Sequence, residues 1–154
     1  MLLHRLLSPH PGYPQVARQN THRIVAIVPH GPIRSLLQSI ARNVGWALTL
    51  SETPLIPAAT RGADTPPIVI CDRELSPYGW QEIIGALADN SPRPYVILLS
   101  PQADANLWDE LQRVGGSDIL RAPVTRESLL RALTKAGQLS DSQQQVRLPP
   151  AAMQ

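Results

Sequence analysis

Short apolar runs alternate along the middle of the chain with stretches in which apolar residues recur at helical spacing. Five runs are apolar throughout instead of alternating with polar residues, which is typical of strands that are buried on both faces of a sheet. The expected strands are residues 24–28, 47–50, 68–71, 95–99 and 119–120, of which 47–50 is the weakest.

Four of these runs are followed by apolar residues spaced three and four apart, which predicts an amphipathic helix after each. Gly45 and Gly115 follow two of the stripes at positions typical of helix ends, and Thr125 can cap the last helix. After the second run, Pro54 and Pro57 limit any helix to a turn or two, so we expect a stunted second helix. The predicted helical stripes include Ile33, Leu36, Leu37, Ile40, Val44, Trp80, Ile83, Ile84, Leu87, Leu107, Leu111, Val114, Leu129, Leu130, Leu133 and Ala136.

Strands that alternate with helices in this way predict an α/β fold with a doubly wound, five-stranded parallel sheet. In such (βα)5 folds, of which the flavodoxin-like fold is one, ligands bind beyond the carboxyl ends of the strands. The residues just past the expected strand ends are Pro29, His30, Asp72, Ser100, Arg121, Ala122 and Pro123.

Length and composition fit one globular domain between two flexible ends. The chain has 154 residues, of which 43% are hydrophobic and 17% are charged, so a disordered chain is excluded. Prolines gather near the start, and the end is rich in Ser and Gln before a pair of prolines. We expect a flexible N-terminal tail over residues 1–21, one domain over 22–138, and a flexible C-terminal tail over 139–154.

Charge and cysteine content narrow the class of protein further. The formal net charge of +2 is too small to indicate a nucleic-acid partner. The single cysteine, Cys71, cannot form an internal disulfide and reads as a small buried hydrophobe, which fits a reducing cytoplasm. No apolar stretch approaches the ~20 residues that a membrane helix needs, so we expect no membrane partner.

From residue 21 to residue 137 the chain resembles the CheY-like receiver domains of bacterial response regulators. Residues 68–77, Ile-Val-Ile-Cys-Asp-Arg-Glu-Leu-Ser-Pro, are similar to the strand with the phospho-accepting aspartate and the proline-containing loop after it. Residues 96–100 end on the serine Ser100, like the fourth strand of that family, and residues 115–123 are similar to the approach to its Lys-Pro pair.

The resemblance implies phosphoryl transfer from a partner histidine kinase to Asp72, with Ser100 as the hydroxyl that binds the phosphoryl group. In the family, Mg²⁺ is held by an acidic pair after the first strand, and a lysine precedes the proline after the fifth. Here the acidic pair falls at Pro29 and His30, and the lysine falls at Ala122. The resemblance therefore implies a degenerate receiver with a disabled or much weakened phosphorylation site.

Neighbouring residues do not replace the missing charges. Asp72 alone should hold Mg²⁺ weakly or not at all, because Mg²⁺ prefers several oxygen ligands. The side chain of Arg121 should point to the face of the sheet opposite to that of the family's lysine, because it lies one residue earlier on the strand. Glu74 is interpreted as a solvent-facing loop acid. Pro101 should stiffen the loop after Ser100. The position of the family's switch aromatic falls at Ile119, which has no ring to rotate.

Asp72 leaves two readings open, since it could accept a phosphoryl group or only hydrogen bonds from loop N–H groups. A partner surface is expected on the last two helices and the fifth strand. There Trp108 adjoins Leu107, so one of the two should be exposed. Receivers engage partners through this region, and Trp and Arg are favoured at interfaces. The residues of this expected surface are Trp108, Arg121, Arg126, Arg131 and Lys135.

The sequence thus predicts a single-domain atypical receiver, not an enzyme, which acts through a protein partner such as a histidine kinase or a downstream regulator. No cofactor is expected, and a homodimer is left open. The first alternative is a working receiver that uses Mg²⁺ and accepts a phosphoryl group on Asp72. The second is a flavodoxin-like nucleotide or flavin binder, although the loop around Pro29 lacks a glycine-rich phosphate motif.

Overall fold

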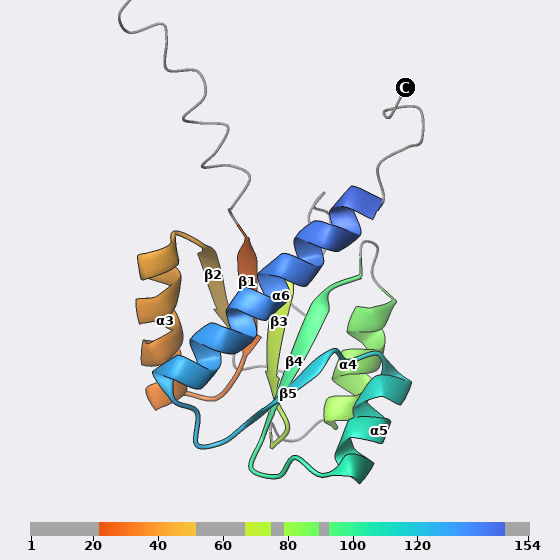
Figure 1. Cartoon of the computed structure of the whole chain (residues 1–154). Coiled ribbons are helices and arrows are strands. Elements are labelled where there is room, and N and C mark those ends of the chain that lie inside the picture. The colour runs from red at the N-terminus through yellow and green to blue at the C-terminus, as the bar shows by residue number, and fades with distance from the viewer. Residues whose placement is uncertain (1–21, 52–66, 75–78, 90–92, 147–154) are drawn as a thin grey trace, which may run out of the picture.

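The computed structural model describes residues 22–51, 67–74, 79–89 and 93–146, with side chains up to residue 140. Its centre is one sheet of five parallel strands in the order β2-β1-β3-β4-β5 (Figure 1). All five strands match the expected runs, which confirms the predicted fold class. The strands are β1 (Arg23–Ile27), β2 (Ala47–Ser51), β3 (Ile68–Asp72), β4 (Tyr95–Ser100) and β5 (Asp118–Arg121).

Helices cover both faces of the sheet, as a doubly wound fold requires (Figure 1). One face carries α3 (Pro32–Val44) and α6 (Arg126–Val146), and the other carries α4 (Trp80–Ala88) and α5 (Ala105–Val114). The stunted second helix was expected after Pro54, and that stretch lies outside the described residues. Among the helices of the described chain, none combines the length and apolarity needed to span a membrane.

The continuous apolar runs follow from this two-sided burial. Along β1, Ile24 and Ala26 contact the core beneath α3 and α6, whereas Val25 and Ile27 contact the core beneath α4 and α5. Each of these four residues is therefore shielded from water on one face of the sheet or the other, so no polar alternation remains along β1. Cys71 is fully buried in the second core, as expected of a small hydrophobe.

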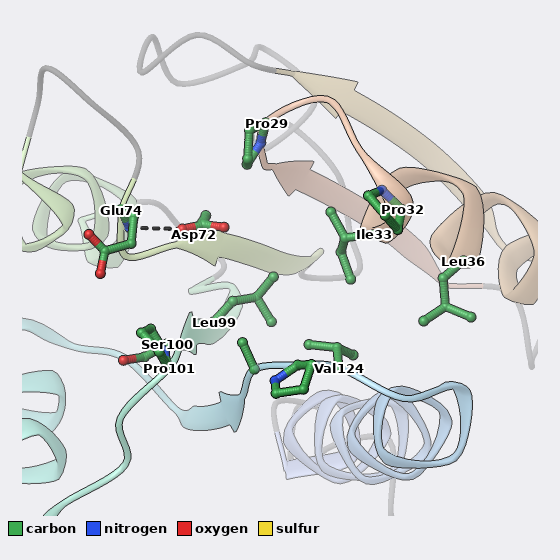
Figure 2. A pocket seen from close by; sticks show the side chains of 12 residues that line it. Pro29, Pro32, Ile33, Leu36, Asp72, Glu74, Leu99, Ser100, Pro101 and Val124 are labelled. Atoms are coloured by element: carbon green, nitrogen blue, oxygen red, sulfur yellow. Dashed lines mark hydrogen bonds between the residues drawn. The ribbon is translucent and has the colours of Figure 1, made fainter.

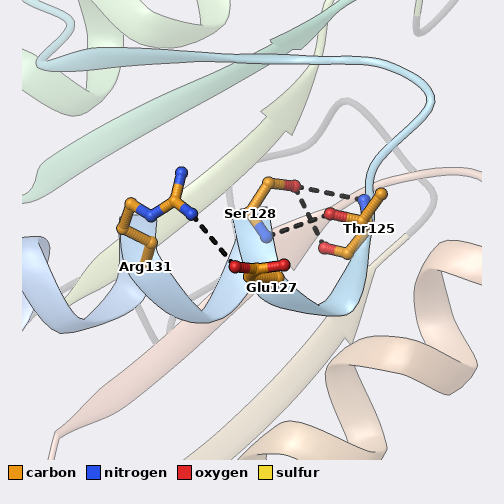
Figure 3. Close-up of polar contacts among 4 residues, drawn as sticks. All are labelled: Thr125, Glu127, Ser128 and Arg131. Atoms are coloured by element: carbon orange, nitrogen blue, oxygen red, sulfur yellow. Dashed lines mark hydrogen bonds and ion pairs between the residues drawn. The ribbon is translucent and has the colours of Figure 1, made fainter.

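The ends of α3 and α5 and the start of α6 form at the residues that the sequence indicates. Gly45 and Gly115 end α3 and α5 with φ of 76° and 104°, a left-handed conformation that glycine adopts without strain. At the start of α6, the Thr125 hydroxyl accepts the Ser128 N–H at 3.0 Å, and the Ser128 hydroxyl accepts the Thr125 N–H at 3.1 Å (Figure 3). This reciprocal pair confirms Thr125 as the cap.

The last helix is longer than the sequence suggests. The pattern predicts that it ends near Gly137 and that a flexible tail begins at residue 139, but α6 continues to Val146. Gly137 lies within the helix, where an added Cβ would meet Trp46 at 3.1 Å and His22 at 3.3 Å. The glycine therefore permits close packing instead of ending the helix. No proline or glycine follows before Val146, and Ser140 is buried one turn further on.

Candidate functional site

A pocket of about 670 Å³ opens at the carboxyl edge of the sheet. It lies where the strand order reverses between β1 and β3, the usual ligand position in doubly wound folds. Its walls come from the β1–α3 segment, the ends of β3 and β4, and the β5–α6 loop (Figure 2). The lining residues are Pro29, Pro32, Ile33, Leu36, Asp72, Glu74, Leu99, Ser100, Pro101, Ala122, Pro123 and Val124.

Asp72 is the acidic group at the end of β3, and it is partly buried. Its Oδ1 accepts the backbone N–H of Glu74 at 2.8 Å, a local turn in which the carboxylate holds its own loop (Figure 2). Glu74 is exposed, and its carboxylate is directed away from Asp72 (Figure 2). The two acids therefore do not form a pair.

Ser100 ends β4 next to Asp72, because Asp72 is in register with Leu99. The Ser100 side chain is buried, and its Oγ accepts two hydrogen bonds. One comes from the Arg73 guanidinium at 3.2 Å and the other from the Gln102 backbone N–H at 3.1 Å. The hydroxyl that the resemblance assigns to a phosphoryl group is thus already bound to an arginine.

Sequence reasoning missed Arg73 as part of this site. The signal was available, because successive side chains of a strand alternate between faces. Asp72 follows Ile70 toward the core of α3 and α6, so Arg73 follows Cys71 toward the other face. There it crosses to the neighbouring strand and reaches Ser100.

The segment between β1 and α3 carries no carboxylate where the family has its acidic pair. Pro29 and His30 are both exposed, and Pro29 lines the pocket. Arg34, one turn into α3, donates to the Val28 carbonyl oxygen at 2.9 Å and to the Pro29 carbonyl oxygen at 3.3 Å. This second arginine was also missed, and it holds the segment by its backbone oxygens.

Ala122 occupies the lysine position at the end of β5. Its backbone N–H donates to the Ser100 carbonyl oxygen at 2.8 Å, which fixes the β5–α6 loop beside β4, and it precedes Pro123 through a cis peptide bond. The methyl side chain lines the pocket without filling it. Alternation along β5 sets exposed Arg121 on the face of Ile119, away from that of Asp72.

Most of the pocket wall is apolar. Ile33 and Leu36 belong to the predicted stripe of α3, and their side chains border the pocket opposite Leu99 (Figure 2). Val124 closes it from the β5–α6 loop. The sequence identifies Ile33 and Leu36 only as members of an apolar helical stripe, and the stripe alone does not show that they border a pocket.

Cys71 lies buried beneath the site, next to Asp72, and this position determines the protonation of its thiol. Burial, with the negative charge of neighbouring Asp72 as a smaller cause, raises the pKa of the Cys71 thiol from 9.0 to about 12. The thiol therefore stays protonated at neutral pH. A protonated, buried thiol is neither a nucleophile nor a metal ligand, so Cys71 adds no chemistry to the pocket.

The expected partner surface is only partly continuous. Trp108 is 36% exposed and Leu107 is 3% exposed, so one of the two leans outward as predicted. Arg126, however, donates to Ser39 on α3 at 2.9 Å, which turns it away from α5. Lys135 lies nine residues later, on the opposite side of α6. Arg131 is exposed and pairs with Glu127 at 3.4 Å (Figure 3), which offsets its like charge with Lys135.

No protein-family model matches the chain, and no curated protein sequence matches it. The fold of the chain is, however, similar to several solved structures. The chemotaxis response regulator CheY4 of Vibrio cholerae has a TM-score of 0.66 and 18% identity, over 75% of this chain and 98% of that chain. The signal receiver domain of an HD domain-containing protein from Pseudomonas fluorescens Pf-5 has a TM-score of 0.68 and 22% identity, over 84% and 95%.

A third neighbour is the receiver domain of the sensor histidine kinase PA1611 from Pseudomonas aeruginosa PAO1, solved with a magnesium ion coordinated in its active site cleft. It has a TM-score of 0.62 and 19% identity, over 77% of this chain and 98% of that chain. All three comparisons span nearly the whole of the matched domain. The chain therefore has the fold of the CheY-like receiver domains of response regulators.

Proposed function

We propose that this chain is an atypical receiver module of two-component signalling that acts by protein–protein contact, with weak or no phosphorylation of Asp72. One observation carries the proposal. Pro29 and Ala122 line the pocket that contains Asp72, at the places where the resemblance expects a metal-binding carboxylate and a lysine. The fold is that of a receiver, whereas a proline, a histidine and an alanine stand where the resemblance expects the charges of such chemistry.

The donor set fits Mg²⁺ poorly. Mg²⁺ demands near-octahedral oxygen coordination and is usually held by one or two carboxylates with water. Asp72 already uses Oδ1 for the Glu74 N–H, Glu74 points away from it, and Pro29 has no ligand atom in its side chain. Across the described part of the chain, no three His, Cys, Asp or Glu side chains gather where they could hold a metal ion.

A phosphoryl group on Asp72 would also lack a counter-charge. It would add about 1.5 to 2 negative charges, which need nearby cations or N–H donors. The two arginines near the site already donate to other oxygens, Arg73 to Ser100 and Arg34 to two backbone carbonyls. Ala122 supplies only a methyl group. These contacts favour a site that stays unphosphorylated.

A working phospho-receiver is the second candidate, and the neighbouring positions of Asp72 and Ser100 favour it. It would require Ser100 to exchange its bond with Arg73 for one with the phosphoryl group. Pro101 restricts the backbone at the start of the loop that would have to move. The flavodoxin-like alternative has no such supporting feature.

We propose that the partner is a protein, such as a histidine kinase or a downstream regulator. The contact surface combines Trp108 with Arg121 and Lys135. Trp108 is the exposed aromatic side chain of α5, and large aromatic and arginine side chains contribute most to interface energies. Arg126 is left out because it is engaged with Ser39.

The test is labelling with acetyl phosphate and Mg²⁺, followed by intact-protein mass spectrometry. We expect no addition of a phosphoryl group to the wild type within minutes. The triple variant Pro29→Asp, His30→Asp, Ala122→Lys restores the missing charges, and it should become labelled. Adding Asp72→Asn to the triple variant should abolish that labelling. Rapid, stoichiometric labelling of the wild type that Asp72→Asn removes would establish the second candidate instead.

A further inference from the structure

We propose that the pocket at the carboxyl edge binds a small organic cation with an apolar body, such as an arylalkylamine. The ammonium group would contact the carboxylate of Asp72, and the apolar body would lie among Ile33, Leu36, Leu99 and Val124 (Figure 2). This goes beyond the proposed signalling function, and rests on it only in that no phosphoryl group or Mg²⁺ occupies Asp72.

The pocket has the dimensions and walls of a small-molecule site. Its volume of about 670 Å³ falls within the ~300–1,000 Å³ typical of such sites, and exceeds what a single inserted side chain would fill. Aliphatic and proline side chains form most of the wall, and the acidic and hydroxyl groups lie toward one side (Figure 2). Mostly apolar walls with few polar groups suit a ligand with one charged end.

The expected positive charge of the ligand follows from the contacts of the two arginines near the pocket. Arg73 donates to Ser100, and Arg34 donates to the Val28 and Pro29 carbonyl oxygens. Ala122 brings no ammonium group to the pocket. Asp72 therefore presents a carboxylate to the pocket, and its partial burial strengthens attraction to a cation. An anionic ligand would meet repulsion at the same place.

The carboxylate is also held in position before any ligand arrives. The Glu74 N–H fixes Oδ1 at 2.8 Å, so the head group does not have to be ordered on binding. A carboxylate has about four lone-pair sites, which leaves room for a second hydrogen bond from an ammonium group. Charge-assisted hydrogen bonds of this kind are roughly twice as strong as neutral ones.

Three indole compounds with the same ring system test the proposal: tryptamine, its neutral alcohol tryptophol, and indole-3-acetate. Binding is measured by isothermal calorimetry and by ¹⁵N–¹H NMR shifts on the full chain at pH 7. We expect saturable tryptamine binding about tenfold tighter than that of tryptophol, with indole-3-acetate weakest. The NMR shifts should map to residues around Ile33, Leu99 and Val124.

Two variants and a matched control distinguish the contribution of the Asp72 charge to binding from that of the cavity space. Asp72→Asn retains an oxygen for the Glu74 N–H, and it should reduce the preference for tryptamine over tryptophol to below about twofold. Ala122→Phe should narrow the pocket beside the apolar wall and weaken binding of all three compounds at least tenfold. Glu82→Gln removes an exposed carboxylate of α4 that does not line the pocket, so it should leave all affinities unchanged.

Absence of saturable binding of all three compounds to a protein with a well-dispersed NMR spectrum would overturn the proposal. Equal binding of tryptamine and indole-3-acetate would overturn the assignment of a cation. These binding results are independent of the test of the proposed function. Acetyl phosphate labelling of the wild type would contradict the proposed function whether or not the indole compounds bind.

Discussion

The cap of α6 allows a quantitative test, because the helix carries two exposed threonines in different roles. The Thr125 hydroxyl accepts the Ser128 N–H at 3.0 Å, and so satisfies a donor that the helix leaves open. The Thr134 hydroxyl donates to the Leu130 carbonyl oxygen at 2.8 Å, a group that can also accept a bond within the helix. The same Thr→Ala change should therefore destabilise the protein at Thr125 but not at Thr134.

The expected magnitudes follow from these contacts. Thr125→Ala removes one capping bond but leaves the two bonds between the Ser128 hydroxyl and the Thr125 backbone, so the free energy of unfolding should fall by about 1 kcal/mol. For a domain of this size, that corresponds to a decrease in Tm of roughly 4 °C. Thr134→Ala should be neutral or raise the free energy of unfolding by a few tenths of a kcal/mol, because alanine is the better helix former.

Urea denaturation, followed by far-UV circular dichroism and by tryptophan fluorescence, measures both variants against the wild type. The midpoint should shift for Thr125→Ala at an unchanged m-value, which shows that the denatured state is not altered. The reasoning is refuted if Thr134→Ala destabilises the protein as much as Thr125→Ala does. It is equally refuted if Thr125→Ala leaves the midpoint unchanged.

Two further predictions concern buried titratable groups. Burial, and to a smaller extent the charge of Asp118, raises the pKa of Tyr95 from 10.0 to about 12, so its stabilising contribution is complete below pH 10 and is lost as the pH rises toward 12. Tyr95→Phe should flatten the decrease in unfolding free energy between pH 10 and pH 12, and an unchanged slope would contradict this. Cys71, with its pKa near 12, should react with Ellman's reagent only after unfolding, whereas fast reaction of the native protein would show an accessible thiol.

The sequence is sufficient for most of the fold because the local and tertiary signals agree. The apolar runs, the left-handed glycines Gly45 and Gly115, and the cap at Thr125 are each confirmed. Gly137 is the exception. By local rules it ends a helix, but the structure uses it for close packing against Trp46, a contact across about ninety residues of sequence. No local pattern contains that information.

The candidate site was predictable in outline and not in its contacts. The position of the pocket follows from the topology, because the carboxyl ends of parallel strands meet at one edge. The face on which Arg73 lies follows from alternation along β3, but its hydrogen-bond partner, like those of Arg34, depends on which oxygens lie within reach. Arg126 was expected beside Trp108 on grounds of charge and region, but its contact with Ser39 places it against α3.

The proline-rich rim around the pocket supports both functional proposals. Pro29, Pro32, Pro101 and Pro123 all line it, and each fixes the backbone φ angle at its position. A rim with restricted backbone needs little ordering when a ligand binds, so more of the contact energy remains as affinity. The same restriction opposes the loop movement that a phosphorylation switch requires. The prolines thus favour a preformed binding pocket over a switching site, for the same physical reason.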